Sequence, residues 1–115
     1  MKLSIFLIAL FSASGFAHTF GPTSMYNARG SGDYTHIIMQ ITSKWSGFYS
    51  FSVGGIPVVD SKGKPIQEFV IAGIRADFPM SINNRYIVKD HILICSWENR
   101  TDVTFRQEVC FNVKV

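Results

Sequence analysis

The chain is poor in the residue patterns from which most catalytic and metal sites are built. Its 115 residues include only two cysteines and three histidines, His18, His36 and His91, and the histidines fall in separate segments. The sequence has no Cys-x-x-Cys or His-x-His spacing, no Gly-x-Ser-x-Gly elbow and no glycine-rich phosphate loop. We therefore expect no catalytic residue, no metal and no cofactor, and we predict that the chain is not an enzyme.

Charge is also sparse. Charged residues make up 17% of the chain, and the formal net charge is +3. No run of five or more basic residues occurs, and nucleic-acid-binding proteins usually carry such clusters. We expect no nucleic-acid partner.

Long apolar runs are missing, apart from a short one at the N-terminus. Lys2 precedes the apolar run Leu3–Phe11, and small residues follow at Gly15 and Ala17. This layout is typical of a secretory signal peptide, and the run falls short of the ~20 apolar residues of a membrane span. We predict a signal peptide over residues 1–17 that is cleaved after Ala17. A domain of residues 18–115 would remain, with no membrane span, in the endoplasmic reticulum lumen or secreted.

Helical periodicity is absent from the rest of the chain, and apolar residues alternate at period two. The clearest case is Tyr49 to Val53, and similar strand patterns cover 35–42, 69–74, 86–97 and 105–115. Turn-forming residues recur about every dozen positions, which is typical of a sandwich or a barrel. We predict an all-β fold of about seven strands in two packed sheets. The aromatic candidates for its core or core margin are Trp45, Phe48, Phe51, Phe69, Phe78, Trp97 and Phe111.

A glycan acceptor pattern lies in the polar turn after the strand pattern that ends at Trp97. Asn99, Arg100 and Thr101 form the one Asn-x-Ser/Thr sequon of the sequence. A secretory signal and a polar turn both favour the use of such a site. We predict N-glycosylation of Asn99.

Five segments, met in order, resemble one protein family. They are SKW at 43–45, IPVVD at 56–60, KGKPIQ at 62–67, FPMSIN at 78–83 and HILICSW at 91–97. From about Ile37 onward the chain is similar to the immunoglobulin-like accessory proteins of coronaviruses that are encoded by open reading frame eight, which are related to those of frame seven-a. The resemblance implies a small immunoglobulin-like β-sandwich of the secretory pathway. It also implies a non-enzymatic viral protein that binds host immune or secretory-pathway proteins and alters interferon signalling and antigen display.

The resemblance assigns Cys95 to an inward-facing family cysteine on the penultimate strand. The family partner of that cysteine lies in an early strand of the opposite sheet, where this chain has Ile37 or a neighbour. The disulfide between the sheets is therefore expected to be absent. Apolar packing of Ile37, Trp45 and Leu93 is expected to replace it.

The pairing of the two cysteines with each other depends on which way they face. We take Cys95 to point inward with Leu93 and Trp97. On the last strand the inward residues would be Phe105, Val109, Phe111 and Val113, so Cys110 would point outward. Side chains alternate strictly along a strand, so opposite directions favour two unpaired thiols. An outward Cys110 could then link two chains into a homodimer. A Cys95–Cys110 disulfide through a bulged last strand is the alternative.

Two function classes follow from these patterns. In the first, the sandwich binds host proteins through exposed aromatics, for which Tyr26, Phe48, Tyr49 and Tyr86 are candidates. In the second, a small secreted β-barrel carries an apolar ligand. A domain of this size hardly encloses a cavity of about 300 Å³ while also filling a core, so we favour the first class.

Overall fold

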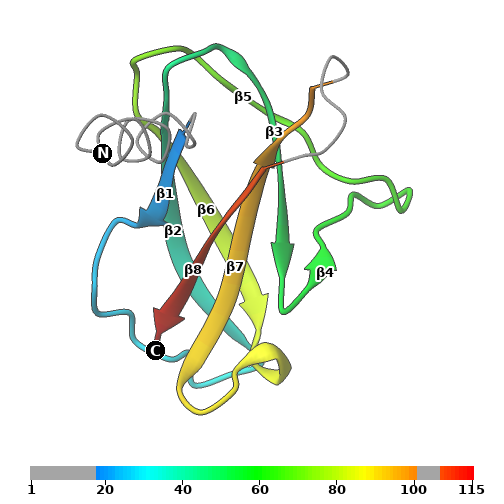
Figure 1. Cartoon of the computed structure of the whole chain (residues 1–115). Coiled ribbons are helices and arrows are strands. Elements are labelled where there is room, and N and C mark those ends of the chain that lie inside the picture. The colour runs from blue at the N-terminus through cyan, green and yellow to red at the C-terminus, as the bar shows by residue number, and fades with distance from the viewer. Residues whose placement is uncertain (1–17, 101–106) are drawn as a thin grey trace, which may run out of the picture.

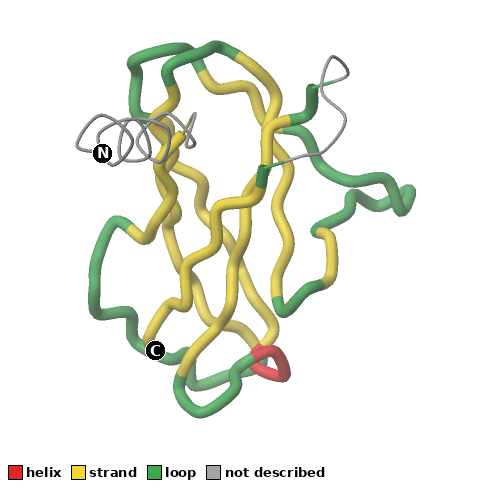
Figure 2. Tube along the Cα trace, in the orientation of Figure 1, coloured by secondary structure: helices red, strands yellow, loops and turns green. Residues whose placement is uncertain are grey.

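In the described part of the chain, β-branched and aromatic segments form eight strands, and there is one short 3-10 helix (Figures 1 and 2). The structure is a computed structural model that describes residues 18–100 and 107–115. The elements are β1 His18–Pro22, β2 Tyr34–Ser43, β3 Gly47–Val53, β4 Ile56–Pro57, β5 Glu68–Val70, β6 Ala76–Asn83, η1 Asn84–Tyr86, β7 His91–Glu98 and β8 Glu108–Lys114. The predicted signal peptide with its cleavage site at Ala17, and also Thr101 and Phe105, lie outside the described residues.

Two antiparallel sheets pack face to face. One has the order β1-β2-β6, and the other has the order β4-β3-β7-β8, with β5 pairing with β3 as well. The chain crosses from one sheet to the other after β2, returns after β5 and crosses again after η1, so β6 joins the sheet of β1 and β2 (Figure 1). Two antiparallel sheets linked in this way form an immunoglobulin-like sandwich. The predicted fold class is confirmed.

The inner faces of both sheets supply the core. Its buried members are Phe20, Ile37, Met39, Ile41, Tyr49, Phe51, Val53, Val70, Ile82, Ile92, Ile94 and Val113. Phe51 therefore lies in the core as predicted, and Phe78 and Phe111 pack at its margin. Trp45, Phe48 and Phe69 are about half exposed, so their proposed core role is wrong.

The direction of β7 differs from the sequence prediction. Ile92 and Ile94 face the core, so the alternate residues Leu93, Cys95 and Trp97 share the opposite, outer face. Leu93 is 44% exposed, which rules out the expected packing of Trp45 and Leu93 against Ile37. The prediction failed because β7 carries apolar residues on both faces, so the sequence pattern does not show which face points into the core.

Tight turns connect the strands where the backbone enters the left-handed region. Gly54 and Gly55, with φ of 58° and 83°, join β3 to β4, a conformation that glycine adopts without steric cost. Lys89 and Asp90 have φ of 49° and 65°. They close a two-residue turn flanked by Val88 and His91, which exchange both backbone hydrogen bonds. The strand pattern predicted over 86–97 is therefore interrupted, and β7 begins only at His91.

No helix within residues 18–100 and 107–115 is long and apolar enough to cross a membrane.

Candidate functional site

The two cysteines form a disulfide on the outer face of the larger sheet. Cys95 and Cys110 are direct partners in the β7–β8 register, and their Cα atoms lie 4.0 Å apart. The prediction of two unpaired thiols is wrong, as is that of a homodimer linked through Cys110, because the Cys110 sulfur is bonded within the chain. The register runs without a break from His91 to Trp97, so the pair forms without the expected bulge. The outward direction of Cys95 also contradicts its assignment to an inward family cysteine.

Metal-binding side chains do not gather into an available site in the described part of the chain. One group of three donors lies close together there, Cys95, Glu108 and Cys110. Both sulfurs belong to the disulfide, and a thiolate is the form that binds metals. His36 and His91 are held elsewhere, His36 by Ser81 Oγ and His91 by the Lys89 carbonyl.

Four polar side chains form a small cluster between the sheets at one end of the core. His18 Nε2 lies 2.9 Å from Ser96 Oγ, and the Tyr49 hydroxyl lies 2.8 Å from Ser43 Oγ. The rings of His18 and Tyr49 meet edge to face, with centroids 4.8 Å apart. These contacts satisfy buried polar groups and join β1 and β2 to β3 and β7.

Burial sets the charge state of this cluster. Desolvation lowers the pKa of His18 and raises that of Tyr49, so both side chains are neutral at pH 7. None of its four members is a cysteine or a carboxylate and all four are buried, so we describe the cluster as a structural feature. The sequence patterns gave no sign of it, since His18 stands alone at the predicted mature N-terminus.

Asn99 lies just beyond the end of β7, with its side chain at the surface. Its Nδ2 donates a hydrogen bond of 2.7 Å to Ser50 Oγ, which in turn donates to the Ile66 carbonyl. An asparagine amide has two hydrogens, so this contact leaves one for replacement by a sugar. Glycosylation of Asn99 stays a prediction that this geometry can accommodate.

Four large apolar side chains are exposed in the β2–β3 turn, in β3 and in or just after β5. Trp45, Phe48, Phe69 and Ile71 are 54%, 47%, 52% and 53% exposed, and we call them the aromatic surface. Phe48 and Phe69 are partners in the β3–β5 register. Their rings meet edge to face at 5.1 Å between centroids. Because Phe48 alternates with buried Tyr49, both rings lie on the outer face of the sheet.

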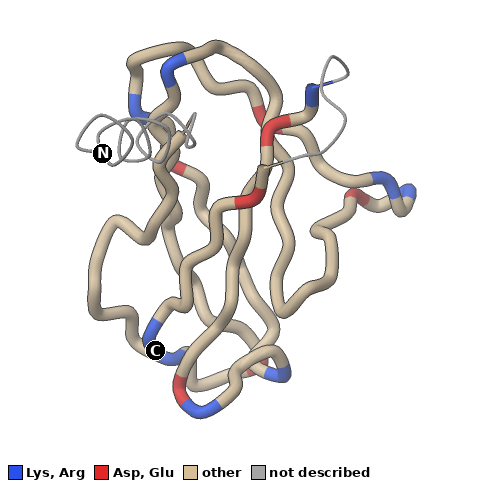
Figure 3. The backbone as a smooth tube through the Cα atoms, viewed as in Figure 1, with Lys and Arg blue, Asp and Glu red and all other residues tan. Residues whose placement is uncertain are grey.

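Two backbone amides after β5 donate hydrogen bonds to the end of β2 and to the β2–β3 turn, and so connect the two turns that carry this surface. The Ala72 amide donates to Ser46 Oγ at 2.9 Å, and the Gly73 amide donates to the Ser43 carbonyl at 2.8 Å. A hollow of about 410 Å³ adjoins the surface, lined by Trp45, Ser46, Gly47, Phe48, Glu98, Asn99 and Arg100. Charged residues sit mainly in turns and at the ends of strands around the sandwich (Figure 3). The aromatic surface is thus a supported apolar area with polar residues at one margin.

The predicted contact residues fall in different places. Phe48 belongs to the aromatic surface, whereas Tyr49 has no exposed area, so its proposed contact role is wrong. Tyr26 is 85% exposed in the loop between β1 and β2. Tyr86 is partly buried against the core. Sequence reasoning placed Trp45 and Phe69 in the core and so missed them as surface residues.

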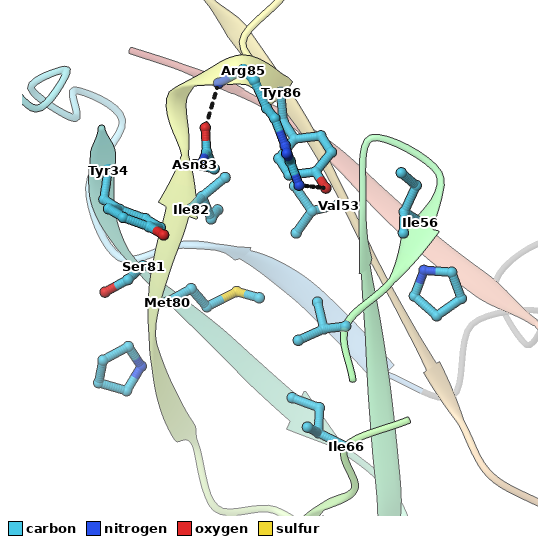
Figure 4. Close-up of a pocket in the computed structure, with 13 residues that line it drawn as sticks. Tyr34, Val53, Ile56, Ile66, Met80, Ser81, Ile82, Asn83, Arg85 and Tyr86 are labelled. Atoms are coloured by element: carbon cyan, nitrogen blue, oxygen red, sulfur yellow. Dashed lines mark hydrogen bonds between the residues drawn. The ribbon is translucent and has the colours of Figure 1, made fainter. Parts of the chain in front are cut away.

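A groove opens on the side of the sandwich between β6 and the β3–β4 hairpin (Figure 4). Its volume is about 420 Å³. Apolar side chains from both sheets, among them Val58, Ile66 and Met80, line its length, and Tyr34, Arg85 and Tyr86 stand at one end.

No family model, curated protein or solved structure matches this chain. The function argued below therefore depends on the geometry of the molecule and on the sequence motifs.

Proposed function

We propose that the protein is a non-enzymatic viral accessory protein of the secretory pathway that binds host proteins through its aromatic surface. Its biological effect would be on the host immune response, including interferon signalling and antigen display. The observation that carries the proposal is the joint exposure of Trp45, Phe48, Phe69 and Ile71 on two turns that hydrogen bonds hold together.

Exposed apolar groups of this kind are unfavourable in water unless a partner covers them. Scattered surface apolar residues are ordinary, but contiguous apolar patches commonly mark interaction sites. Tryptophan, phenylalanine and arginine are enriched at protein interfaces, with the apolar residues at the centre and polar ones at the rim. The aromatic surface, with Arg100 in the adjoining hollow, has this composition.

The viral and immune parts of the proposal come from the motifs, and the secretory part comes from the N-terminal pattern. The disulfide agrees with an oxidising compartment, in which such bonds form and persist. A glycan on Asn99 would stand at the margin of the hollow next to Arg100. The side of the surface formed by Phe69 and Ile71 would stay open to a partner.

The experiment is affinity capture from the secretory compartments of host cells with purified, secreted protein. We expect a defined host protein to bind the natural chain and to be lost from Trp45→Ala and Phe48→Ala. Tyr26→Ala is the matched control, because it removes an exposed aromatic from a distant loop and should leave capture unchanged. Circular dichroism and melting curves establish that all variants are folded. Equal capture by the natural chain and both surface variants would contradict the proposal.

The secretory route has its own test. Mass spectrometry of the secreted protein, before and after glycosidase treatment, should give a mature N-terminus at His18 and a glycan mass on Asn99. If the secreted protein still contains residues 1–17, the predicted cleavage is refuted.

A further inference from the structure

We infer that the lateral groove binds a long-chain carboxylate, with its carboxylate held at Arg85 and its apolar chain lying between the sheets. The inference is independent of the proposed function. The groove lies beside η1 and β6, whereas the aromatic surface lies at the opposite end of β2 (Figure 1).

The groove exists because the two sheets do not close on this side. Strand β6 is an edge of one sheet and β4 is an edge of the other, and no strand within the described residues bridges them. Core-facing side chains are therefore only partly buried here, including Val58, Ile66, Phe78 and Met80. The volume of about 420 Å³ falls within the range of small-molecule sites, and the walls are mainly apolar, as in such sites.

The polar groups of the groove gather at one end. Asn83 caps η1 by accepting a hydrogen bond of 3.0 Å from the Arg85 amide. Arg85 Nη2 donates to the Tyr86 hydroxyl at 3.2 Å, and the guanidinium lies 5.1 Å from the centre of the Tyr86 ring (Figure 4). These contacts place the cation at the mouth of the groove and leave donors free, since a guanidinium carries five N–H groups.

The charges favour an anionic head group at this end. No acidic residue lines the groove, and within the described chain Arg85 has no carboxylate at ion-pair distance. A second hollow of about 240 Å³ shares Ile66, Pro79 and Met80 with the groove and ends at Glu68 and Asp77. Arg85 thus attracts an anion at one end, and Glu68 repels it at the other, where Asp77 is paired with Arg75. This difference orients an amphiphile with its carboxylate at Arg85.

The edges of the groove argue against an added peptide strand as the occupant. Pro57 lies in β4 and Pro79 in β6, and both line the groove. Proline lacks the amide hydrogen that an incoming strand would need, and natural sheets use it to block edge pairing. A small molecule that makes apolar contacts does not require that hydrogen bond.

The test is a fluorescence titration with cis-parinaric acid, a polyene carboxylate whose emission rises in apolar surroundings, and with its methyl ester. We expect saturable binding of the acid at one site per chain. Arg85→Gln should weaken it about tenfold, as loss of one charge-assisted contact implies. Lys44→Gln is the control, since this exposed lysine lines neither the groove nor the second hollow.

The ester separates the role of the carboxylate from that of the apolar walls. It should bind the natural chain and Arg85→Gln equally, because neither complex contains the ion pair. Arg85 is exposed, so its variants should stay folded. The inference is overturned if the acid shows no saturable binding, if Arg85→Glu binds it as tightly as the natural chain, or if a groove-filling Val58→Trp variant that melts normally leaves binding unchanged.

Discussion

The two long sides of the sandwich differ in how closely the two sheets approach each other. On one side, β1 and β8 lie in contact, and a Cβ at Gly21 would be at an ordinary van der Waals distance of 3.6 Å from the Phe111 ring. On the other side, β6 and the β3–β4 hairpin stay apart and leave the lateral groove. We conclude that the β1–β8 side closes the core, whereas the β6–β4 side is packed less completely and leaves room for a ligand.

Phe51 lies between the two sides of the core. The Phe51 ring packs against Phe20 from the closed side at 6.0 Å and against Phe78 from the open side at 5.3 Å between centroids. Phe20 is buried, whereas Phe78 is only partly so. Because Phe20 and Phe78 are the same residue type and differ in burial, substitutions at the two positions compare the packing of the two sides directly.

The largest expected effect is therefore on stability at Phe20. Phe20→Ala should lower the free energy of unfolding by about 3–5 kcal/mol, the usual range for a buried phenylalanine. Phe78→Ala should cost about 1–2 kcal/mol, because less of its area leaves water on folding. Urea unfolding of the two variants measures the difference. Equal losses would mean that the two sides are packed alike.

Removal of the disulfide should have the next largest effect. The bond joins residues 15 positions apart, and a loop of that length implies a loss of about 3 kcal/mol when it is opened. The Cys95→Ala/Cys110→Ala double variant should melt at a lower temperature but stay monomeric and folded. Alkylation of the natural protein without reductant should modify neither cysteine. A thiol titrated in that experiment would disprove the pairing.

Acid should weaken the closed side through His18. Its pKa is lowered by burial, so the unfolded chain takes up a proton at a higher pH than the folded chain does. Stability from the neutral ring is complete above about pH 6.5 and is lost as the pH falls below that value toward the lower folded pKa. The melting temperature should therefore drop across this window. His18→Gln should flatten the profile there, and an unchanged slope in that variant would rule out His18 as the cause.

The smallest expected effect is a gain in stability from substitutions in the turn between η1 and β7. Lys89 and Asp90 both have positive φ, and asparagine followed by glycine suits such a turn better. Lys89→Asn/Asp90→Gly should add about 1 kcal/mol to the free energy of unfolding. Chemical denaturation would show it as a higher midpoint at constant slope. Destabilisation would mean that the two side chains make contacts worth more than the backbone strain.

The sequence predicted the architecture better than the directions of individual strands. The β-branched run of β2, the alternation in β3 and the recurring turn residues were enough to predict an all-β sandwich. In β7, the run of Ile92, Leu93, Ile94 and Cys95 is apolar at every position, so only the pairing of Ser52 with Cys95 reveals which face is inward. The disulfide was mispredicted for the same reason.

The candidate surfaces were harder to predict because they depend on where elements end. Trp45 and Phe69 have core-type side chains, but Trp45 lies in the turn between β2 and β3, and Phe69 faces outward because it alternates with buried Val70. The groove depends on β6 and β4 both being sheet edges with no strand of the described residues between them, and no local sequence pattern encodes that arrangement. Phe48, which was named as a contact candidate, is exposed, but sequence alone could not separate it from its buried neighbour Tyr49.

The most direct test of the proposed function is hydrogen–deuterium exchange of the protein alone and bound to the captured host protein. We predict added protection in residues 43–49 and 68–74, which carry the aromatic surface, and unchanged exchange along β6 and β4. Protection confined to β6 and β4, with none near Trp45 and Phe48, would contradict the proposal.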